Sequence, residues 1–418
     1  MLLERSSFSE KISANNQFFY FRTRDSDTII IIGGENMDNN ALIEFTRDII
    51  RIRSFSGEEG PVVERIVLEM NRLGYDDAWI DQAGNALGLI QGHKPGKCIL
   101  LDAHVDTVNA NPEDWHSDPW GADIREGRIY GHGSADTKGN LAAMVYGAAQ
   151  VNREQLIGSI IVCGSVHEEV MEGGSLQLVM KENQPDYVVI GEATNLQLNR
   201  GGRGRAEVVV ETIGKSAHSS SPEIGICAVH AMLRLIEAIE QIPSQQHPFL
   251  GSGSMVLTDI ISYPYPGSSV IPNRCRVTFD RRLLLNETID SVVDEVKTCA
   301  HTANVDCTVT VLDGQETTYR GHQMRSPKFF PAWVLDEEHP LVQHAYAALK
   351  NVNSNTEIKS FQFCTNGASS AGMYVIPTIG YGLGKETDAH TTNESISIEE
   401  LDQAALGYQA IIQAVLSH

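Results

Sequence analysis

The 418-residue sequence has few basic residues, no long apolar run and no paired cysteine motif. Lys and Arg number 32 against 54 Asp and Glu, which gives a net charge of −22. A nucleic-acid partner requires a basic face to neutralise phosphates, so this charge balance excludes that class. No apolar run approaches the ~18–20 residues that a membrane-spanning helix needs. We therefore expect a soluble globular protein with neither a nucleic-acid nor a membrane partner.

The seven cysteines are scattered, and no two of them have Cys-x-x-Cys spacing. An odd, unpatterned set is more typical of reduced thiols than of a disulfide framework, which favours a cytoplasmic protein. We expect Cys163 and Cys364 to be buried thiols rather than nucleophiles, because no activating base is apparent in the sequence near either.

The N-terminal 36 residues do not fit the pattern of the rest of the chain. The apolar run Ile29–Ile32 is too short for a secretory signal, and an amphipathic helical pattern begins only after Met37. We interpret residues 1–36 either as a mis-called extension before a natural start at Met37 or as a disordered or docking tail.

Helix and strand patterns alternate from residue 37 to 205, as in a mostly parallel sheet that is covered on both faces. From 206 to 318 the order becomes β-α-β-β-α-β, the ferredoxin-like arrangement. The alternating pattern resumes over 319–418. The sequence thus predicts an α/β catalytic domain in two parts, interrupted by an inserted α+β domain.

Four apolar segments of strand type lead to carboxylates or imidazoles. In open α/β sheets ligands bind beyond the carboxyl ends of the strands, so these side chains are expected to converge on one site. The four segments lead to His104 with Asp106, to Glu168 with Glu169, to Glu192, and to Asp388 with His390.

These residue types suit a pair of divalent cations that share a bridging carboxylate. His104 is a candidate ligand, and Asp106 is expected to fix its tautomer. Asp136 lies at a Gly-rich strand-to-helix turn and suits the bridge, although it could also be a helix N-cap. Adjacent Glu168 and Glu169 point in different directions, so one can bind metal while the other faces a water molecule.

Eight motifs together resemble the acetylornithine deacetylase / succinyl-diaminopimelate desuccinylase / aminoacylase family of di-metal hydrolases, whose members have a zinc-exopeptidase-like catalytic domain. Four further segments look like its branch of selenium-metabolism-linked hydrolases: Tyr319-Arg, Phe329-Phe-Pro-Ala-Trp333, Cys364-Thr-Asn-Gly367 and Gly384-Lys-Glu386. The eight motifs, in family order, are His104-Val-Asp106-Thr, Gly133-Ser-Ala-Asp136-Thr-Lys-Gly139, Glu168-Glu169, Glu192-Ala-Thr194, Ala217-His-Ser219, Val270-Ile-Pro272, Asp280-Arg-Arg282 and Ala389-His-Thr-Thr-Asn-Glu394.

The resemblance implies a ligand set for two metal ions, zinc first and cobalt or manganese as substitutes. His104, Asp136 and Glu192 would hold one ion, and Asp136, Glu169 and His390 the other. Relatives that hydrolyse ureido compounds generally carry His where this chain has Glu192, so an acyl amide or a peptide is the expected substrate.

The resemblance also implies roles for residues outside the ligand set. Glu168 would be the general base and acid. His218, on the insert, would stabilise the oxyanion of the transition state. It would do so across a homodimer formed through the inserted domain, where it reaches the partner's metals. Arg282 would anchor a substrate carboxylate, unless it only pairs with Asp280, and Arg203 would add a second charge contact.

The sequence therefore predicts a metal-dependent hydrolase of N-acyl amino acids or short peptides that uses a metal-activated water. A dipeptidase or carboxypeptidase of the same fold is one alternative, and a non-catalytic metal-binding dimer is another. We expect His132 and His167, which lie near the predicted chemistry, to have structural roles.

Overall fold

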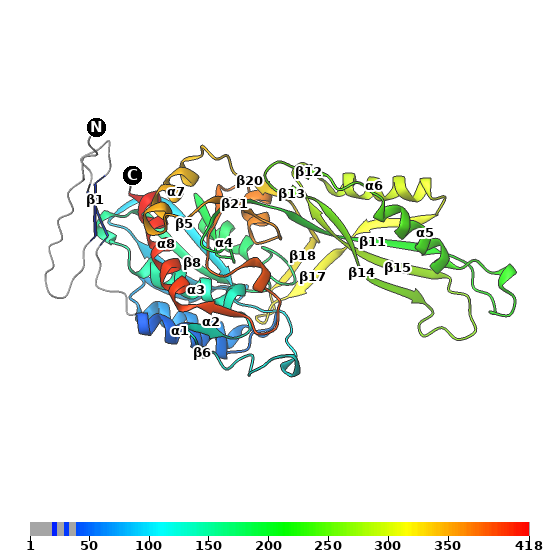
Figure 1. Cartoon of the computed structure of the whole chain (residues 1–418), viewed down its shortest axis with the longest axis horizontal. Helices are drawn as coiled ribbons and strands as arrows, with labels where there is room; N and C mark the ends of the chain where they lie inside the picture. Colours follow the sequence, from blue (N-terminus) through cyan, green and yellow to red (C-terminus); the bar gives the residue numbers. More distant parts are fainter. Residues whose placement is uncertain (1–18, 23–28, 33–38, 418) are drawn as a thin grey trace, which may run out of the picture.

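The computed structural model describes residues 19–22, 29–32 and 39–417, and it has a layered α/β body from which a narrower lobe extends (Figure 1). Within the first 36 residues it places β1 (Phe19–Arg22) antiparallel to β2 (Ile29–Ile32). The prediction about residues 1–36 otherwise concerns residues that lie outside the described ones. The first helix, α1, spans Asn39–Arg51, as the pattern after Met37 predicts.

The body is built on a sheet whose centre is parallel. Strands β9, β5 and β8 are parallel neighbours, β22 pairs parallel with β9, and the edge pairs β3–β4 and β10–β20 are antiparallel. The strand bounds are β3 Asp77–Ile80, β4 Ala86–Gln91, β5 Lys94–His104, β8 Ile157–Ser165, β9 Tyr187–Ile190, β10 Leu198–Gly202, β20 Trp333–Val334, β21 Ile358–Phe361 and β22 Thr378–Gly380.

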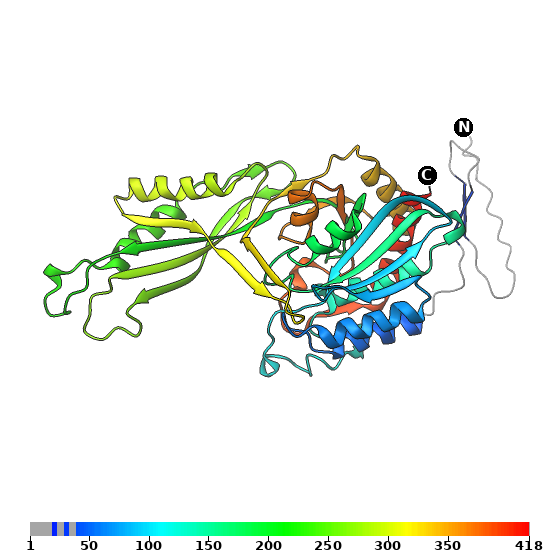
Figure 2. The same cartoon turned by 180° about the vertical axis from the view of Figure 1, so that it is seen from behind.

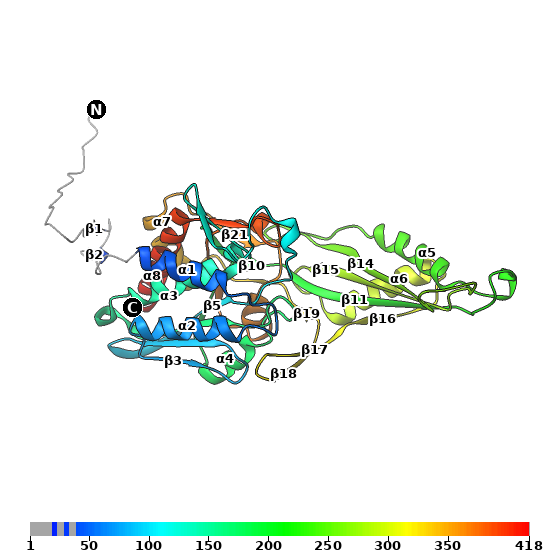
Figure 3. The same cartoon turned by 90° about the horizontal axis from the view of Figure 1, so that it is seen from below.

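Both faces of this sheet are buried because successive side chains of a strand point to opposite sides. In β5, Ile99 and Leu101 join the main core, whereas Leu100 joins a smaller cluster under α4. The other helices pack on the main-core side, and Figure 3 shows α1 and α2 running side by side along the body. Their bounds are α2 Gly60–Arg72, α3 Gly139–Ala149, α4 Leu176–Asn183, α7 Pro340–Val352 and α8 Ile398–Leu416.

The lobe is the inserted domain, and it has its own hydrophobic core. Its sheet has the order β14-β15-β11-β16, which is the ferredoxin-like order for the chain path β11-α5-β14-β15-α6-β16. Figure 2 shows α5 and α6 on one face of this sheet. The bounds are β11 Gly204–Ile213, α5 Ala228–Glu240, β14 Ser254–Tyr263, β15 Arg274–Leu283, α6 Ile289–Thr302 and β16 Cys307–Val311. The predicted fold class is confirmed.

Short strands complete the described structure. A hairpin of β17 and β18 follows the insert, and β19 then pairs with β11. None of the helices within the described residues is long and apolar enough to cross a membrane. The remaining bounds are β6 Asp123–Arg125, β7 Arg128–Tyr130, β12 Gln246–His247, β13 Gly251–Ser252, β17 Asp313–Thr317, β18 Gln323–Pro327, β19 Phe329–Phe330 and β23 Ser395–Ser397.

Candidate metal centre and active site

The three central strands deliver candidate ligands to one edge of the sheet. His104 is the last residue of β5, Glu169 follows β8, and Glu192 follows β9. Because β9, β5 and β8 are parallel neighbours, their carboxyl ends lie at the same edge. Asp136 comes from the turn before α3, and His390 from the segment between β22 and β23.

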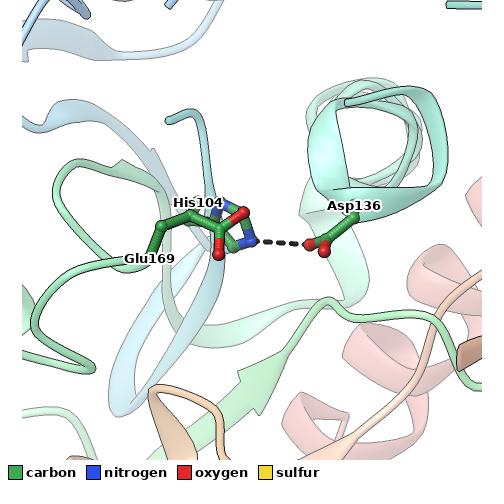
Figure 4. Close-up of side chains that lie close together, drawn as sticks. All are labelled: His104, Asp136 and Glu169. Atoms are coloured by element: carbon green, nitrogen blue, oxygen red, sulfur yellow. Dashed lines mark hydrogen bonds and ion pairs between the residues drawn. The ribbon is translucent and has the colours of Figure 1, made fainter. Parts of the chain in front are cut away.

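Asp136 lies between the two imidazoles. Its Oδ1 is 2.9 Å from His104 Nε2 and its Oδ2 is 3.2 Å from His390 Nε2. Glu192 Oε1 lies 3.7 Å from His104 Nε2, and Glu169 Oε2 lies 3.0 Å from His390 Nε2. The structure therefore brings together all five predicted ligands. The Asp136 carboxylate lies between two groups, His104 with Glu192 and His390 with Glu169. Figure 4 shows His104, Asp136 and Glu169, which come from three separate elements.

The electrostatics of this cluster favour a cation. Burial raises the pKa of Glu168 and Glu192 well above the usual range of a carboxyl group. The hydrogen bond to Asp136 is the largest cause that raises the pKa of His390, to about 10. Four acidic side chains thus lie around two imidazoles in a largely buried space. Negative charge in such a space is costly unless positive charge compensates it. Ligand atoms of His104, Asp136 and Glu169 all lie within 4.8 Å of one another, so the donor set fits divalent cations.

The carboxylate of Asp106 has hydrogen-bond partners other than His104, the one predicted. His104 Nδ1–H donates to the main-chain oxygen of Asp106 at 2.8 Å, while the Asp106 carboxylate lies 3.7 Å away. That carboxylate instead accepts the N–H groups of Glu168 at 3.0 Å and Glu169 at 3.1 Å, and the hydroxyl of Ser56 at 2.7 Å. A main-chain carbonyl therefore fixes the tautomer of His104, and the side chain of Asp106 holds the Glu168–Glu169 backbone.

Glu394 supports Asp136, a role that sequence reasoning missed. Its Oε1 accepts the N–H groups of Ala135 at 2.6 Å and Asp136 at 2.9 Å, and its Oε2 accepts that of Gly133 at 2.8 Å. Glu394 is only 2% exposed. Its place four residues after His390 within one motif was the only signal in the sequence.

Two histidines near the centre have structural contacts, as predicted. His132 Nε2 bonds to the main-chain oxygen of Val108 at 2.7 Å. His167 Nδ1 bonds to Glu59 at 2.9 Å, and Glu59 is fully buried at the start of α2. Nothing in the sequence around Glu59 indicated this contact. The pair fixes the residue that precedes Glu168.

Two arginines lie near each other at the junction between body and insert. Burial is the main cause that lowers the pKa of Arg203, and the nearby positive charge of Arg282 adds to it. Arg282 Nε pairs with Asp280 Oδ1 at 2.9 Å, and Arg203 donates to the main-chain oxygen of Ser252 at 2.5 Å. The ion pair between Arg282 and Asp280, which was the alternative role for Arg282, is thus formed. The positive charges of two guanidinium groups that act on each other nevertheless favour a bound anion.

His218 does not join the cluster within its own chain. It is exposed, bonds to the hydroxyl of Ser220 at 2.7 Å and forms an isolated bridge with Val270. Its segment, between β11 and α5, lies at the end of the insert far from the body (Figure 1).

Cys163 and Cys364 are buried free thiols, as predicted. Burial raises the pKa of each thiol well above its usual value, which disfavours the thiolate.

Comparison with known proteins gives a family and a fold. Residues 100–414 match the model of peptidase family M20/M25/M40. The chain is 32% identical over 378 residues to uncharacterized protein YgeY of Escherichia coli K12, covering 88% of this chain and 93% of that protein. It is 26% identical to succinyl-diaminopimelate desuccinylase 2 of a Ruegeria species, covering 89% and 94%. The solved structure of aminopeptidase PepT from Bacillus cereus superposes with a TM-score of 0.70 at 20% identity, covering 91% and 99%.

Proposed function

Since the chain belongs to the peptidase family M20/M25/M40, we infer that it is a metal-dependent amide hydrolase. We propose that it uses two divalent cations, most simply zinc, and that its substrates are N-acyl amino acids or short peptides. The relatives named for removing acyl groups support this substrate class.

The position of Asp136 is the observation that carries the proposal. Its two oxygens face different imidazoles, at 2.9 Å from His104 and 3.2 Å from His390. A carboxylate that only capped a helix would not need two imidazoles. We propose that His104 and Glu192 complete one cation site, and that Glu169 and His390 complete the other.

Bound cations would supply Lewis acidity that polarises the amide carbonyl and lowers the pKa of a water molecule. Glu168 then has the role of proton carrier. It lies beside the centre. Its main-chain N–H donates to the Asp106 carboxylate, which holds in place the backbone from which the Glu168 side chain extends. Burial raises its pKa, which suits a group that takes a proton from water and passes it to the leaving nitrogen near neutral pH.

The two arginines favour a substrate with a free carboxylate. Arg282 and Arg203 are both near the junction of body and insert, and a planar guanidinium binds a carboxylate through two parallel hydrogen bonds. We propose that Arg282 anchors this carboxylate and that Arg203 contributes further positive charge.

We also propose a homodimer in which His218 completes the partner's site. Strand β14 is an edge strand of the insert, and it exposes the apolar residues Val256, Ile260 and Ile261. An edge strand of this kind readily pairs with another chain, and a two-fold axis would make the pairing mutual. Such an arrangement gives the distal position of His218 a function. The free thiols support a cytoplasmic location.

The test is a turnover screen of the purified protein after chelation and reloading. N-acetyl, N-formyl and N-succinyl amino acids are assayed beside dipeptides, with zinc, cobalt or manganese added, and bound metal is measured by mass spectrometry. We expect two ions per chain and hydrolysis only after reloading. Asp136→Asn should bind fewer ions and lose activity. Preference for dipeptides would support the peptidase alternative, and metal binding without any turnover would support the non-catalytic one.

A further inference from the structure

Arg205, at the start of β11, is a mostly buried guanidinium that contacts three carboxylates. It forms an ion pair with Glu172, in which Nη2 donates a hydrogen bond to Oε2 at 3.1 Å and Nε lies 2.5 Å from Oε1. Its Nη2 also lies 3.1 Å from Glu207, and its Nη1 lies 3.7 Å from Asp280. The metal-centre chemistry described above assigns no role to Arg205.

One side of this cluster leads to the proposed substrate anchor. Asp280 contacts both arginines, because its Oδ1 is 2.9 Å from Arg282 Nε and its Oδ2 is 3.7 Å from Arg205 Nη1. Arg205 and Arg282 are also direct partners across the antiparallel β11–β15 pair. A substrate carboxylate bound to Arg282 would compete with Asp280, whose charge would then turn toward Arg205.

The other side leads to the proposed general base. Glu172 belongs to the segment that follows β8, and it lies four residues after Glu168. The Met171 N–H bonds to the main-chain oxygens of His167 and Glu168, so this segment is a compact turn. Burial raises the pKa of the Cys364 thiol most, and the charges of Glu172, Arg205, Glu168 and Arg282 also act on this thiol.

We propose that Arg205 is a positioning residue that couples the substrate-carboxylate anchor Arg282 to the turn bearing Glu168, through Asp280 on one side and Glu172 on the other. The inference rests on the proposed function, because both ends of the coupling are roles assigned there. It adds that the insert and the catalytic turn are joined by a buried ion-pair chain. A substrate without a carboxylate would not engage this chain.

Breaking a buried pair leaves an uncompensated charge, whereas breaking an exposed pair changes little. Arg205→Met removes the cation at similar length. The matched control is Arg325→Met, which breaks the pair with Asp313 in the β17–β18 hairpin, where the arginine side chain is 72% exposed. If Arg205→Met does not fold, Arg205→Lys replaces it, because a single ammonium nitrogen cannot contact Glu172, Glu207 and Asp280 at once as the three guanidinium nitrogens do.

The first measurement is kcat/KM for the N-acetyl amino acid that wild type hydrolyses fastest and for its carboxamide. We expect Arg205→Met to lower kcat/KM for both substrates, because both need Glu168, but for the acid by roughly tenfold more than for the carboxamide, because only the acid engages Arg282. In the Arg282→Met background the same change should lower kcat/KM for the acid only by the factor seen for the carboxamide, because coupled residues are not additive. A purely structural defect would lower kcat/KM for both substrates by the same factor. Equal losses, or additive effects with Arg282→Met, would overturn the proposal.

The second measurement needs no substrate. Hydrogen exchange of residues 168–174 is followed by mass spectrometry, and we expect it to accelerate by roughly fivefold in Arg205→Met and in Asp280→Asn but not in Arg325→Met. Unchanged exchange in Arg205→Met would refute the coupling even if the enzyme is active. If wild type hydrolyses no substrate, the proposed function fails, and this measurement alone decides whether Arg205 holds the turn.

Discussion

Glu394→Gln tests whether a residue outside the ligand set builds the metal centre. The carboxylate accepts three main-chain N–H groups, at 2.6, 2.8 and 2.9 Å, from the turn that carries Asp136. Glutamine keeps the shape, but its NH₂ group would face a buried N–H donor in place of one oxygen.

The expected cost follows from these contacts. A hydrogen bond to a charged acceptor contributes about 1.5–3 kcal/mol, and a buried unsatisfied donor costs about 1–3 kcal/mol. With one bond lost and two weakened, we expect a loss of about 3–5 kcal/mol in the free energy of unfolding. Because Asp136 itself belongs to this turn, metal affinity should fall as well.

The assay is urea unfolding of the metal-free protein, followed by calorimetric titration with zinc. Glu399→Gln is the control, because Glu399 is an exposed residue in the first turn of α8, where charge contributes at most about 1 kcal/mol. If Glu394→Gln unfolds within about 1 kcal/mol of wild type and binds zinc as tightly, the carboxylate does not hold the turn, and the reasoning is wrong.

Three further predictions concern the proposed chemistry. Glu168→Gln should keep near-normal metal content and lose roughly 10²–10⁴-fold in kcat, and a variant that retains more than about a tenth of wild-type kcat would contradict the role of Glu168. Mixing His218→Ala chains with Glu168→Ala chains should restore about a quarter of wild-type activity, because half of the dimers then hold one intact site of two; verified subunit exchange without recovery would show that His218 does not act in trans. In the metal-free protein the pKa of His390 is raised to about 10 by its hydrogen bonds to Asp136 and Glu169, so its stabilisation is complete below the usual value of 6.5 and is lost as pH rises through about 10. The melting temperature of the metal-free protein should therefore fall more between pH 8 and 10 than that of His390→Gln, and equal falls would argue against the ion pairs.

The sequence was sufficient to predict that the candidate ligands converge, because each of them follows a recognisable strand or turn. The run Ile99–Leu101 is apolar on both faces, which is typical of a central strand, and the strand that contains it ends at His104, at the sheet edge. The insert was visible because its strand and helix order changes at residue 206. Local patterns of this kind depend only on burial and on backbone geometry, which neighbouring residues already specify.

The contacts that hold the ligands in place required the tertiary structure. Glu394 bonds to the Asp136 N–H across 258 positions, and Glu59 bonds to His167 across 108. The carboxylate of Asp106 was expected to serve its own neighbour, His104, but folding brings the N–H groups of Glu168 and Glu169 within its reach. Likewise, Arg205 lies in β11 and Glu172 in the segment after β8, so no local pattern connects them. The sequence by itself determined which candidate ligands follow strands and turns, because local burial patterns specify those elements. The chain's long-range packing decided which buried groups orient them, because hydrogen bonds form between groups that are close in space, however far apart they are in sequence.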